Sequence, residues 1–349
     1  MPRKPGSLRV TDVADAAAGR GQLLLNVKRV GVCGTDEDII AGFYGEAPKG
    51  SPYLILGHES LSTVEEAGPE TTGFRRGDLV VPTVRRDCPE ECLNCRSGES
   101  DMCMTGHYSE HGIKGLHGFA SELAATDARF VAKLPQSLSE AGVLLEPLTI
   151  VEKGVALTFA AQNARMKWEP GRALVLGSGA VGLLATAVLR LRGLSVDAVA
   201  TRPADAPKAR LVSSLGATYV DAKETPISSL GRSYDIVFEA TGSTDVALEA
   251  QNLTRVNGVV SYVGIYRSKV ETEDAGSLFT DLVLGNRLLF GSVNANISYF
   301  RQGSDDLVKV AREWPGFLEK MITEKVPLEK AEQAYGPKGD ESVKTVVEM

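Results

Sequence analysis

The chain has 349 residues, of which 43% are hydrophobic and 24% are charged, and its formal net charge is −7. This length favours two domains, and the composition is that of a globular protein. The negative charge argues against a general nucleic-acid or anionic-membrane binder. At the N-terminus no apolar run follows the basic residues, so we expect no secretory signal and a cytoplasmic protein.

The first predicted strand, "QLLLNVKRVGVCGTD", alternates in polarity and ends at a glycine turn beside Cys33. A second strand-like run, "YLILGHES", ends at Gly57, His58 and Glu59. A lone cysteine or histidine is more often a core residue than a metal ligand. Here both lie at predicted strand ends beside glycines, where side chains can face a cleft.

Four of the five cysteines lie within the segment "DCPEECLNCRSGESDMCM". Cys88, Cys92, Cys95 and Cys103 have the spacing C-x3-C-x2-C-x7-C, which suits four thiolates around a tetrahedral zinc ion. Two disulfides or free buried cysteines are the alternatives, but reduced thiols are usual in the cytosol. Because four protein ligands leave no open position for a substrate, we expect a structural zinc.

The segment "GVLLEPLTIVEKGVAL" places Glu146 among apolar residues, where a buried carboxylate needs a partner. Cys33, His58 and Glu146 together offer three zinc ligands and one open position, which is the arrangement of a catalytic zinc site. Spacing alone does not link these residues in space, so the catalytic zinc is a hypothesis at this point.

A strand, a glycine turn and a helix are predicted from "RALVLGSGAVGLLATAVLRLRG", whose uncharged run is short for a membrane span. Gly177, Gly179 and Gly182 form G-x-G-x-x-G between strand and helix, which is the context of a dinucleotide-binding turn. Ala180 and Val181 lie at the helix N-terminus that would face the pyrophosphate, so they are further candidates. An ordinary strand–helix turn is the alternative.

The next predicted strand, "LSVDAVATRP", lacks at its end the acidic residue that usually binds the ribose 2′-hydroxyl of NAD. Asp197 lies too early in the strand, and Thr201 and Arg202 follow at its end. A neutral strand end followed by arginine suits the 2′-phosphate of NADP. The alternative is that Arg202 is a solvated surface residue.

Further strands are predicted in "YDIVFEATG", "GVVSYVGI" and "RLLFGSV", with helical stretches between them. This alternation indicates an α/β fold with a doubly wound parallel sheet, a Rossmann domain over residues 154–291. Residues 1–153 and 292–349 are predicted to form a mainly β domain that holds both zinc sites. Its tail is predicted to be helical in "DDLVKVAREW" and "PGFLEKMITE" and to end in a strand, "VKTVVEM".

The segments "GVCGTD", "LGHE", the four-cysteine stretch and "GSGAVG" follow one another along the chain. In this order they resemble the zinc-dependent medium-chain dehydrogenase/reductase superfamily, and the match spans essentially the whole chain. "GVCGTDEDIIAG", "SGESDMC", "EPLTIVEK", "FEATGS" and "FGSVNAN" are most similar to its glucose 1-dehydrogenase branch. The resemblance implies that the mainly β domain is GroES-like and catalytic.

The resemblance also implies which residues bind the metal and the reacting hydroxyl. Cys33, His58 and Glu146 would bind the catalytic zinc, and Glu59 would be an alternate or neighbouring ligand. Thr35 would touch the reacting hydroxyl and assist its proton transfer. Glu146 and Thr35 would therefore both face the substrate.

Three more residues receive a role from the resemblance. Asn294, in "GSVNAN", would lie near both nicotinamide and sugar. Glu110, in "HYSEHGI", is a candidate for a sugar hydroxyl, and Thr241, in "FEATGS", is a candidate for the cofactor.

Three features depart from the pattern of this branch. The cysteine segment usually begins with C-x2-C, whereas its first gap here is x3, which bends the first loop without destroying the site. Ile297, Ser298 and Tyr299 stand where basic or histidine residues often follow "GSVNAN", and Ile150 stands where some members carry a sugar-binding aspartate. The last two changes bear on the sugar, and fewer polar groups would suit a less hydroxylated or 6-deoxy substrate.

The implied reaction is hydride transfer from C1 of an aldose to NADP, or alternatively to NAD, which gives the lactone. A polyol or secondary-alcohol dehydrogenase with the same metal is one alternative, and a non-catalytic NADP-binding relative is another. Because superfamily members are commonly dimers or tetramers, we expect a homodimer or homotetramer. We expect a small-molecule sugar as partner, and neither nucleic acid nor a membrane.

Overall fold

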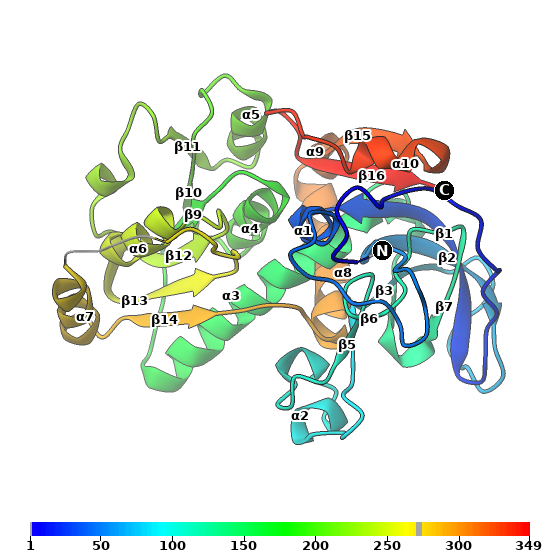
Figure 1. Ribbon diagram of the computed structural model, residues 1–349. Coiled ribbons are helices and arrows are strands. Elements are labelled where there is room, and N and C mark those ends of the chain that lie inside the picture. The colour runs from blue at the N-terminus through cyan, green and yellow to red at the C-terminus, as the bar shows by residue number, and fades with distance from the viewer. Residues whose placement is uncertain (1, 270–273) are drawn as a thin grey trace. The chain divides into compact units, whose positions relative to one another are not determined.

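The computed structural model describes residues 2–269 and 274–349. The chain divides into two compact units, which Figure 1 colours along the sequence. The first comprises Met1–Thr149, Asn294–Val308 and Leu318–Met349, and the second comprises Ile150–Val293 and Lys309–Phe317. The predicted α/β fold class is confirmed, because one unit holds a parallel sheet and the other a mainly antiparallel one. The domain bounds inferred from the sequence stay a prediction.

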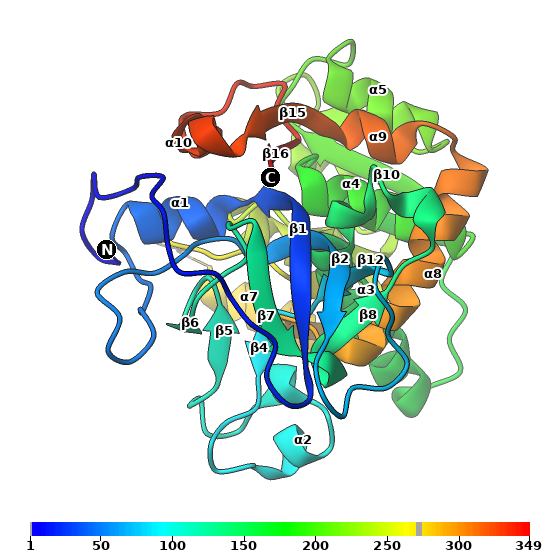
Figure 2. The ribbon, with the colours of Figure 1, turned by 90° about the vertical axis from the view of Figure 1, so that its right-hand side faces the viewer.

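The first unit is built on a sheet in the order β15-β16-β1-β2-β3-β8, with β7 also paired to β1. Figure 2 shows β1, β2 and β7 along one side of this unit. Its strands are β1 (Gln22–Val32), β2 (Glu59–Ala67), β3 (Leu79–Pro82), β7 (Leu123–Asp127), β8 (Val131–Lys133), β15 (Ile322–Pro327) and β16 (Lys344–Glu348). Because β1 pairs with three strands and buries most of its side chains, it forms the centre of the unit.

A small sheet of β4 (Arg85–Arg86), β5 (Ser109–His111) and β6 (Gly115–Leu116) completes the strands described in this unit. The chain between β4 and β5 contains α2 (Leu93–Arg96), and Figure 2 shows it projecting away from the larger sheet. We call residues 88–103 the four-cysteine lobe.

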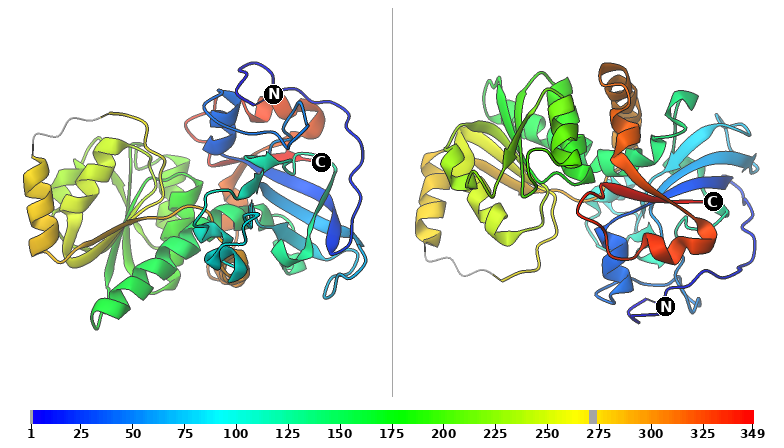
Figure 3. Two further views of the ribbon diagram at one scale, coloured as in Figure 1. Left: turned by 60° about the horizontal axis from the view of Figure 1, so that its bottom comes forward. Right: turned by 90° about the horizontal axis from the view of Figure 1, so that it is seen from above.

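The second unit holds a parallel sheet in the order β11-β10-β9-β12-β13-β14. Figure 3 shows helix α4 on one face of this sheet and α6 on the other, as in a doubly wound fold. The strands are β9 (Arg172–Leu176), β10 (Ser195–Ala200), β11 (Thr218–Asp221), β12 (Tyr234–Glu239), β13 (Thr254–Tyr262) and β14 (Leu288–Gly291). The helices are α4 (Ala180–Leu191), α5 (Pro207–Ser214), α6 (Thr244–Leu253) and α7 (Ala275–Leu284).

The boundary between the units falls inside two long helices, α3 (Leu145–Arg165) and α8 (Ile297–Glu313). The remaining helices are α1 (Gly34–Ile40), α9 (Phe317–Met321) and α10 (Ala331–Ala334). Within the part of the chain that the structure describes, none of the helices is long and apolar enough to cross a membrane.

Most predicted elements are confirmed, but two are wrong in part. The run "YLILGHES" is not a strand that ends at Glu59, because β2 begins there. Gly57 has φ +88 and interrupts the extended path, while the carbonyls of residues 55–57 accept bonds from residues 118–120. The predicted helix "PGFLEKMITE" ends at Met321, because the following residues pair with β16 as β15.

His111, in β5, is a buried histidine that the fold keeps neutral. Its Nδ1 donates to the carbonyl of His117 at 2.6 Å, and its ring stacks on Phe119 with centroids 4.6 Å apart. Burial, together with the charge of Arg86, lowers the pKa of His111 to about 3.

This depressed pKa makes stability depend on pH with a definite sign. The contribution of neutral His111 to the free energy of unfolding is fully present above the unfolded pKa of about 6.5. It falls by about 1.4 kcal/mol per pH unit as the pH drops from there towards 3. Urea unfolding between pH 7 and pH 4.5 measures it. The variant His111→Asn keeps a donor for the His117 carbonyl but does not titrate, so its unfolding free energy should fall less steeply. An equal slope in both proteins would contradict this account.

Candidate active site

Cys33 stands at the point where β1 gives way to α1, as the N-cap of that helix. Its Sγ accepts from the N–H of Thr35 at 3.3 Å, and Asp36 Oδ2 accepts from the N–H of Cys33 at 3.1 Å. These two bonds fix the cysteine side chain against the helix start. Its Sγ lies 3.0 Å from Nε2 of His58, which comes just before β2.

His58 is oriented by the carboxylate of Asp36, whose residue is 0% exposed. Oδ1 of Asp36 lies 3.5 Å from Nδ1 of His58, on the side of the ring opposite Cys33. Burial opposes a charge on His58, but the charges of Cys33 and Asp36 raise its pKa well above the usual value. A carboxylate behind one ring nitrogen, with the other nitrogen facing a thiol, is how metal-binding histidines are commonly held.

Glu146 and Glu59 bring two carboxylates to the same place. Each offers an oxygen within 4.8 Å of a ring nitrogen of His58 and of the other carboxylate. Glu146 lies in the first turn of α3, and burial, with the charge of Glu59 adding to it, raises the pKa of Glu146 to about 7. Both side chains are buried, so their desolvation favours any cation that can bind them.

Glu59 is already paired with Lys344, the first residue of β16. Lys344 Nζ donates to both carboxylate oxygens at 2.7 Å and to the carbonyl of Val32 at 3.2 Å. A Cβ at Gly31 would lie 2.0 Å from Oε2 of Glu59, so only glycine leaves room for this pair. Because Glu59 is bound to Lys344, it suits a position beside a metal better than a place among its ligands. Cys33, His58 and Glu146 carry the thiol, imidazole and carboxylate groups that zinc binds.

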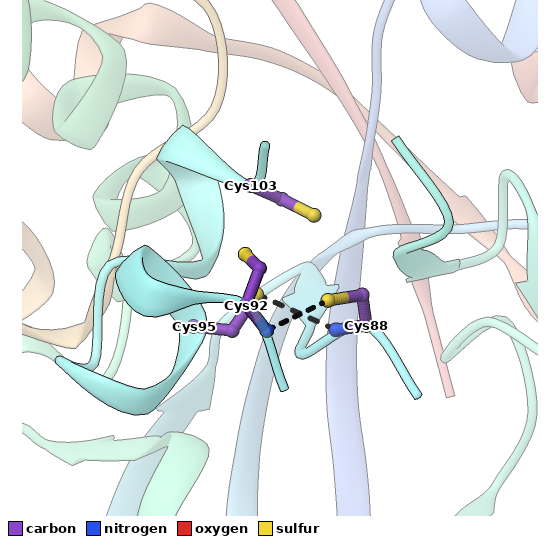
Figure 4. A group of neighbouring side chains, drawn as sticks. All are labelled: Cys88, Cys92, Cys95 and Cys103. Carbon is purple, nitrogen blue, oxygen red and sulfur yellow. Dashed lines mark hydrogen bonds between the residues drawn. The ribbon is translucent and has the colours of Figure 1, made fainter. Parts of the chain in front are cut away.

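The four cysteines of the lobe converge (Figure 4). Their sulfur atoms all lie within 4.8 Å of one another, and each cysteine is a free thiol: Cys88, Cys92, Cys95 and Cys103. Backbone N–H groups point at the sulfurs, with Cys92 N 3.3 Å from the Sγ of Cys88 and Cys88 N 3.4 Å from the Sγ of Cys95. N–H groups aimed at sulfur stabilise thiolates, so this donor set fits a tetrahedral zinc.

The extra residue in the first cysteine gap is absorbed locally. Glu91 has φ +47, in the left-handed region, and its N–H donates to the carbonyl of Cys88 at 3.0 Å. This tight turn brings Cys92 back beside Cys88, so the x3 spacing bends the loop and keeps the sulfurs together.

The glycine turn has the form that the sequence predicts. Gly177 has φ +107 directly after β9, and Gly179 is the N-cap of α4, which begins at Ala180 and Val181. A Cβ at Gly182 would lie 2.0 Å from the carbonyl oxygen of Gly177, so any side chain there would push the helix from the strand. The turn therefore leaves backbone and a helix N-terminus facing outward, as phosphate binding requires.

Thr241 lies beside this turn, after the neighbouring strand β12. A Cβ at Gly177 would lie 3.3 Å from its Cγ2. Thr241 is held by the buried carboxylate of Glu239, whose Oε1 accepts from its N–H at 2.7 Å and from its hydroxyl. The structure thus brings Thr241 to the glycine turn at the carboxyl ends of β9 and β12.

Thr201 and Arg202 follow β10, the strand on the other side of β9. The hydroxyl of Tyr219 clamps the backbone of Arg202: it donates to the carbonyl at 2.6 Å and accepts from the N–H at 3.2 Å. Asp197 lies inside the strand and binds Arg172 and Tyr234, so it does not reach the strand end. The predicted 2′-phosphate position is therefore without the usual acid.

Glu110 and Asn294 meet in the first unit. Nδ2 of Asn294 donates to Oε1 of Glu110 at 3.0 Å, and both residues are buried. The sequence did not predict Asp36, Lys344 or Tyr219. Asp36 lies within "GVCGTD" and could have been found there, but nothing in the sequence links Lys344 with Glu59. The ligand, substrate and cofactor roles of all the predicted residues stay predictions.

Comparison with known proteins places the chain in a family. The model of the glucose dehydrogenase C-terminus matches residues 139–349, and that of the alcohol dehydrogenase GroES-like domain matches residues 19–136. Glucose 1-dehydrogenase of Methanocella arvoryzae is 45% identical over 100% of this chain and 98% of the relative. That of Thermoproteus tenax is 47% identical over 96% of this chain and 94% of the relative.

A solved structure extends the likeness to three dimensions. Haloferax mediterranei glucose dehydrogenase in complex with NADP, zinc and gluconolactone has a TM-score of 0.91, with 33% identity over 100% of this chain and 98% of that one. A GroES-like unit and a Rossmann sheet in one chain define a medium-chain dehydrogenase/reductase. Within that class, the chain belongs to the glucose dehydrogenase family, as the sequence resemblance predicted.

The buried pair of Glu59 and Lys344 yields a stability prediction. Lys344→Met leaves the Glu59 carboxylate buried without its cation, which should lower the free energy of unfolding by about 3–5 kcal/mol. Lys325→Met is the control, because its pairs with Glu140 and Glu348 are exposed and should contribute about 0–1 kcal/mol. Urea unfolding measures both, and similar losses in the two variants would refute the role of burial.

Proposed function

We propose that this protein is a zinc- and NADP-dependent dehydrogenase that oxidises an aldose at C1 to the lactone, with glucose or a close epimer as the first substrate. The observation that carries the proposal is that buried His58 lies against Cys33 on one side and within reach of Glu146, in a chain of the glucose dehydrogenase family. The named ligands of the Haloferax relative, NADP, zinc and gluconolactone, support the substrate class and the cofactors.

Cys33, His58 and Glu146 would hold the catalytic zinc, and Glu59 would stay beside it on Lys344. When bound, zinc would polarise the anomeric oxygen and lower its pKa, and nicotinamide would accept the hydride from C1. Thr35, two residues after Cys33 in α1, would take the hydroxyl proton and pass it to water. Asp36 would keep Nε2 of His58 aimed at the metal.

Gly177, Gly179 and Gly182 would seat the pyrophosphate at the start of α4, with Ala180 and Val181 lending the helix N-terminus. Arg202 would bind the 2′-phosphate, and Thr241 would contact the cofactor. Cys88, Cys92, Cys95 and Cys103 would hold the structural zinc. The homodimer or homotetramer and the cytoplasmic location stay predictions.

Two zinc ions with different tasks give the first prediction of the proposed function. Metal analysis should find up to two per chain. Cys95→Ser should remove one and lower the melting temperature, because the lobe loses its cross-link. Cys33→Ser should weaken the other and abolish turnover while the melting temperature stays near that of the wild type. A Cys92–Cys103 disulfide in a lobe without zinc would refute the assignment.

Cofactor choice gives the second prediction. A charge-assisted bond from Arg202 to the 2′-phosphate contributes about 1.5–3 kcal/mol, so Arg202→Ala should weaken NADP binding by roughly 10- to 150-fold. NAD lacks this phosphate and serves as the internal control, with its dissociation constant nearly unchanged. Fluorescence titration with NADPH and NADH measures both. Equal losses for the two cofactors would show that Arg202 does not read the phosphate.

Substrate choice gives the third prediction. With NADP, initial rates should be highest for aldoses in a panel of glucose, galactose, xylose, fucose, sorbitol and 2-butanol, and lactone should accumulate. Ile150 offers no polar partner to a sugar hydroxyl. If the residue at this position sets the preference between sugars, fucose, a 6-deoxy sugar, should be oxidised about as fast as glucose. Activity confined to sorbitol or 2-butanol would favour the polyol or secondary-alcohol alternative. NADP binding without turnover of any compound would favour a non-catalytic relative.

A further inference from the structure

Arg85, in β4, is a buried arginine that the chemistry above does not use. The residue is 5% exposed, and its guanidinium lies 3.6 Å from the ring centroid of Tyr108. Its Nε donates to Oε1 of Glu110 at 3.1 Å, and its Nη2 lies 3.0 Å from the same oxygen as an ion pair. Its Nη1 donates to the carbonyl of Asp101 at 3.0 Å, in the four-cysteine lobe. One guanidinium thus joins the predicted sugar carboxylate to the lobe.

The same two acidic residues hold the segment that begins at Asn294. Nδ2 of Asn294 donates to Oε1 of Glu110 at 3.0 Å, and Nδ2 of Asn296 donates to Oδ1 of Asp101 at 3.1 Å. Asn294 has φ +58, in the left-handed region that asparagine tolerates, and its Oδ1 accepts from the N–H of Ala295 at 2.9 Å. Two amide–carboxylate pairs therefore fix this segment on either side of Arg85.

The hydrogen bonds of Glu110 are distributed unequally between its two oxygens. Oε1 accepts from Nε of Arg85 and Nδ2 of Asn294 and is ion-paired with Nη2 of Arg85, and Oε2 takes part in none of these contacts. A carboxylate with one oxygen fixed by two hydrogen bonds and an ion pair keeps a single rotamer and presents the other oxygen in a defined direction. A partner held in place in this way loses less conformational entropy when it binds a hydroxyl.

We propose that Arg85 is a positioning residue for sugar recognition. It holds the charge and the rotamer of Glu110 and, through Asp101, ties the four-cysteine lobe to the segment of Asn294. The inference rests on the proposed function, in which Glu110 and Asn294 bind the sugar. It assigns the lobe a second task beyond stability, because the lobe supplies one fixed end of the frame around the substrate.

The experiment compares two adjacent arginines, Arg85, which is buried, and Arg86, which is half-buried. Arg85→Met should raise the KM for glucose about 10- to 100-fold, with a smaller change in kcat and an unchanged dissociation constant for NADPH. Arg86→Met is the matched control, because Arg86 donates to Thr83 and Thr126 and not to Glu110. It should lower the melting temperature and leave the KM for glucose unchanged. A rise in KM of equal size in both variants would mean general loosening, and would overturn the inference.

A double-mutant cycle tests whether Arg85 acts through Glu110. Glu110→Gln should raise the KM for glucose, and adding Arg85→Met should raise it little further, since the partner is already altered. Independent, multiplying effects would overturn the inference. If Arg85→Met does not fold, Arg85→Lys keeps the charge without the two-pronged geometry, and it should show an intermediate KM.

The outcomes separate the inference from the function on which it rests. Wild-type protein that oxidises no aldose and binds no gluconolactone by calorimetry would refute both. Wild-type protein that oxidises glucose, with an Arg85→Met variant that keeps the wild-type KM, would refute the positioning role alone.

Discussion

The burial of three carboxylates beside one histidine and one lysine is the constraint on which the first unit depends. Asp36, Glu59 and Glu146 lie near His58 and Lys344, all of them buried, and the half-buried thiol of Cys33 contacts His58. Each uncompensated charge in such a place would cost several kcal/mol, about as much as the net stability of many domains. Lys344 compensates Glu59, while the pKa of Glu146, raised to about 7, marks a carboxylate that gains from a further cation. Thiolate, imidazole and carboxylate are the usual ligands of zinc, so a single zinc ion would suit the donor atoms of this group and offset their negative charge.

The topology of the larger sheet supplies the cation that compensates Glu59. The sheet order puts β16 beside β1, so the tail of the chain brings Lys344 to a carboxylate at the start of β2. Gly31 gives that carboxylate its room inside β1, and the same strand ends at Cys33, the N-cap of α1. The central strand of the sheet thus leaves space for the Glu59 carboxylate and positions the Cys33 thiol. A substitution at Gly31 would disturb the charge pair by displacing the Glu59 carboxylate.

The sequence predicts what is local and misses what is distant. The glycine turn, the cysteine spacing and each single strand and helix from β9 to β14 lie within a short stretch, where period and turn chemistry decide the structure. The contact of Lys344 with Glu59 joins residues far apart in the chain, and the network of Arg85 joins β4, β5 and the segment of Asn294; no spacing rule reports either. The run before Glu59 shows the limit of periodicity. Its carbonyls accept hydrogen bonds from residues 118–120, as a strand would, but the positive φ of Gly57 ends the extended path before β2 begins.

The charged networks of the first unit and the glycine turn of the second hold their residues by different physical means, and they should therefore tolerate change differently. In the metal cluster and the Arg85 network the constraint is electrostatic, so removing one partner leaves a buried charge or a misdirected one. At the glycine turn the constraint is steric, because Gly182 lies against the carbonyl of Gly177 and no side chain fits between them. The backbone of Arg202, after β10, is fixed by the hydroxyl of Tyr219 on the edge strand. A change of cofactor preference at Arg202 thus leaves the buried carboxylate cluster and the turn intact, whereas removing one buried carboxylate or its cation leaves an uncompensated charge.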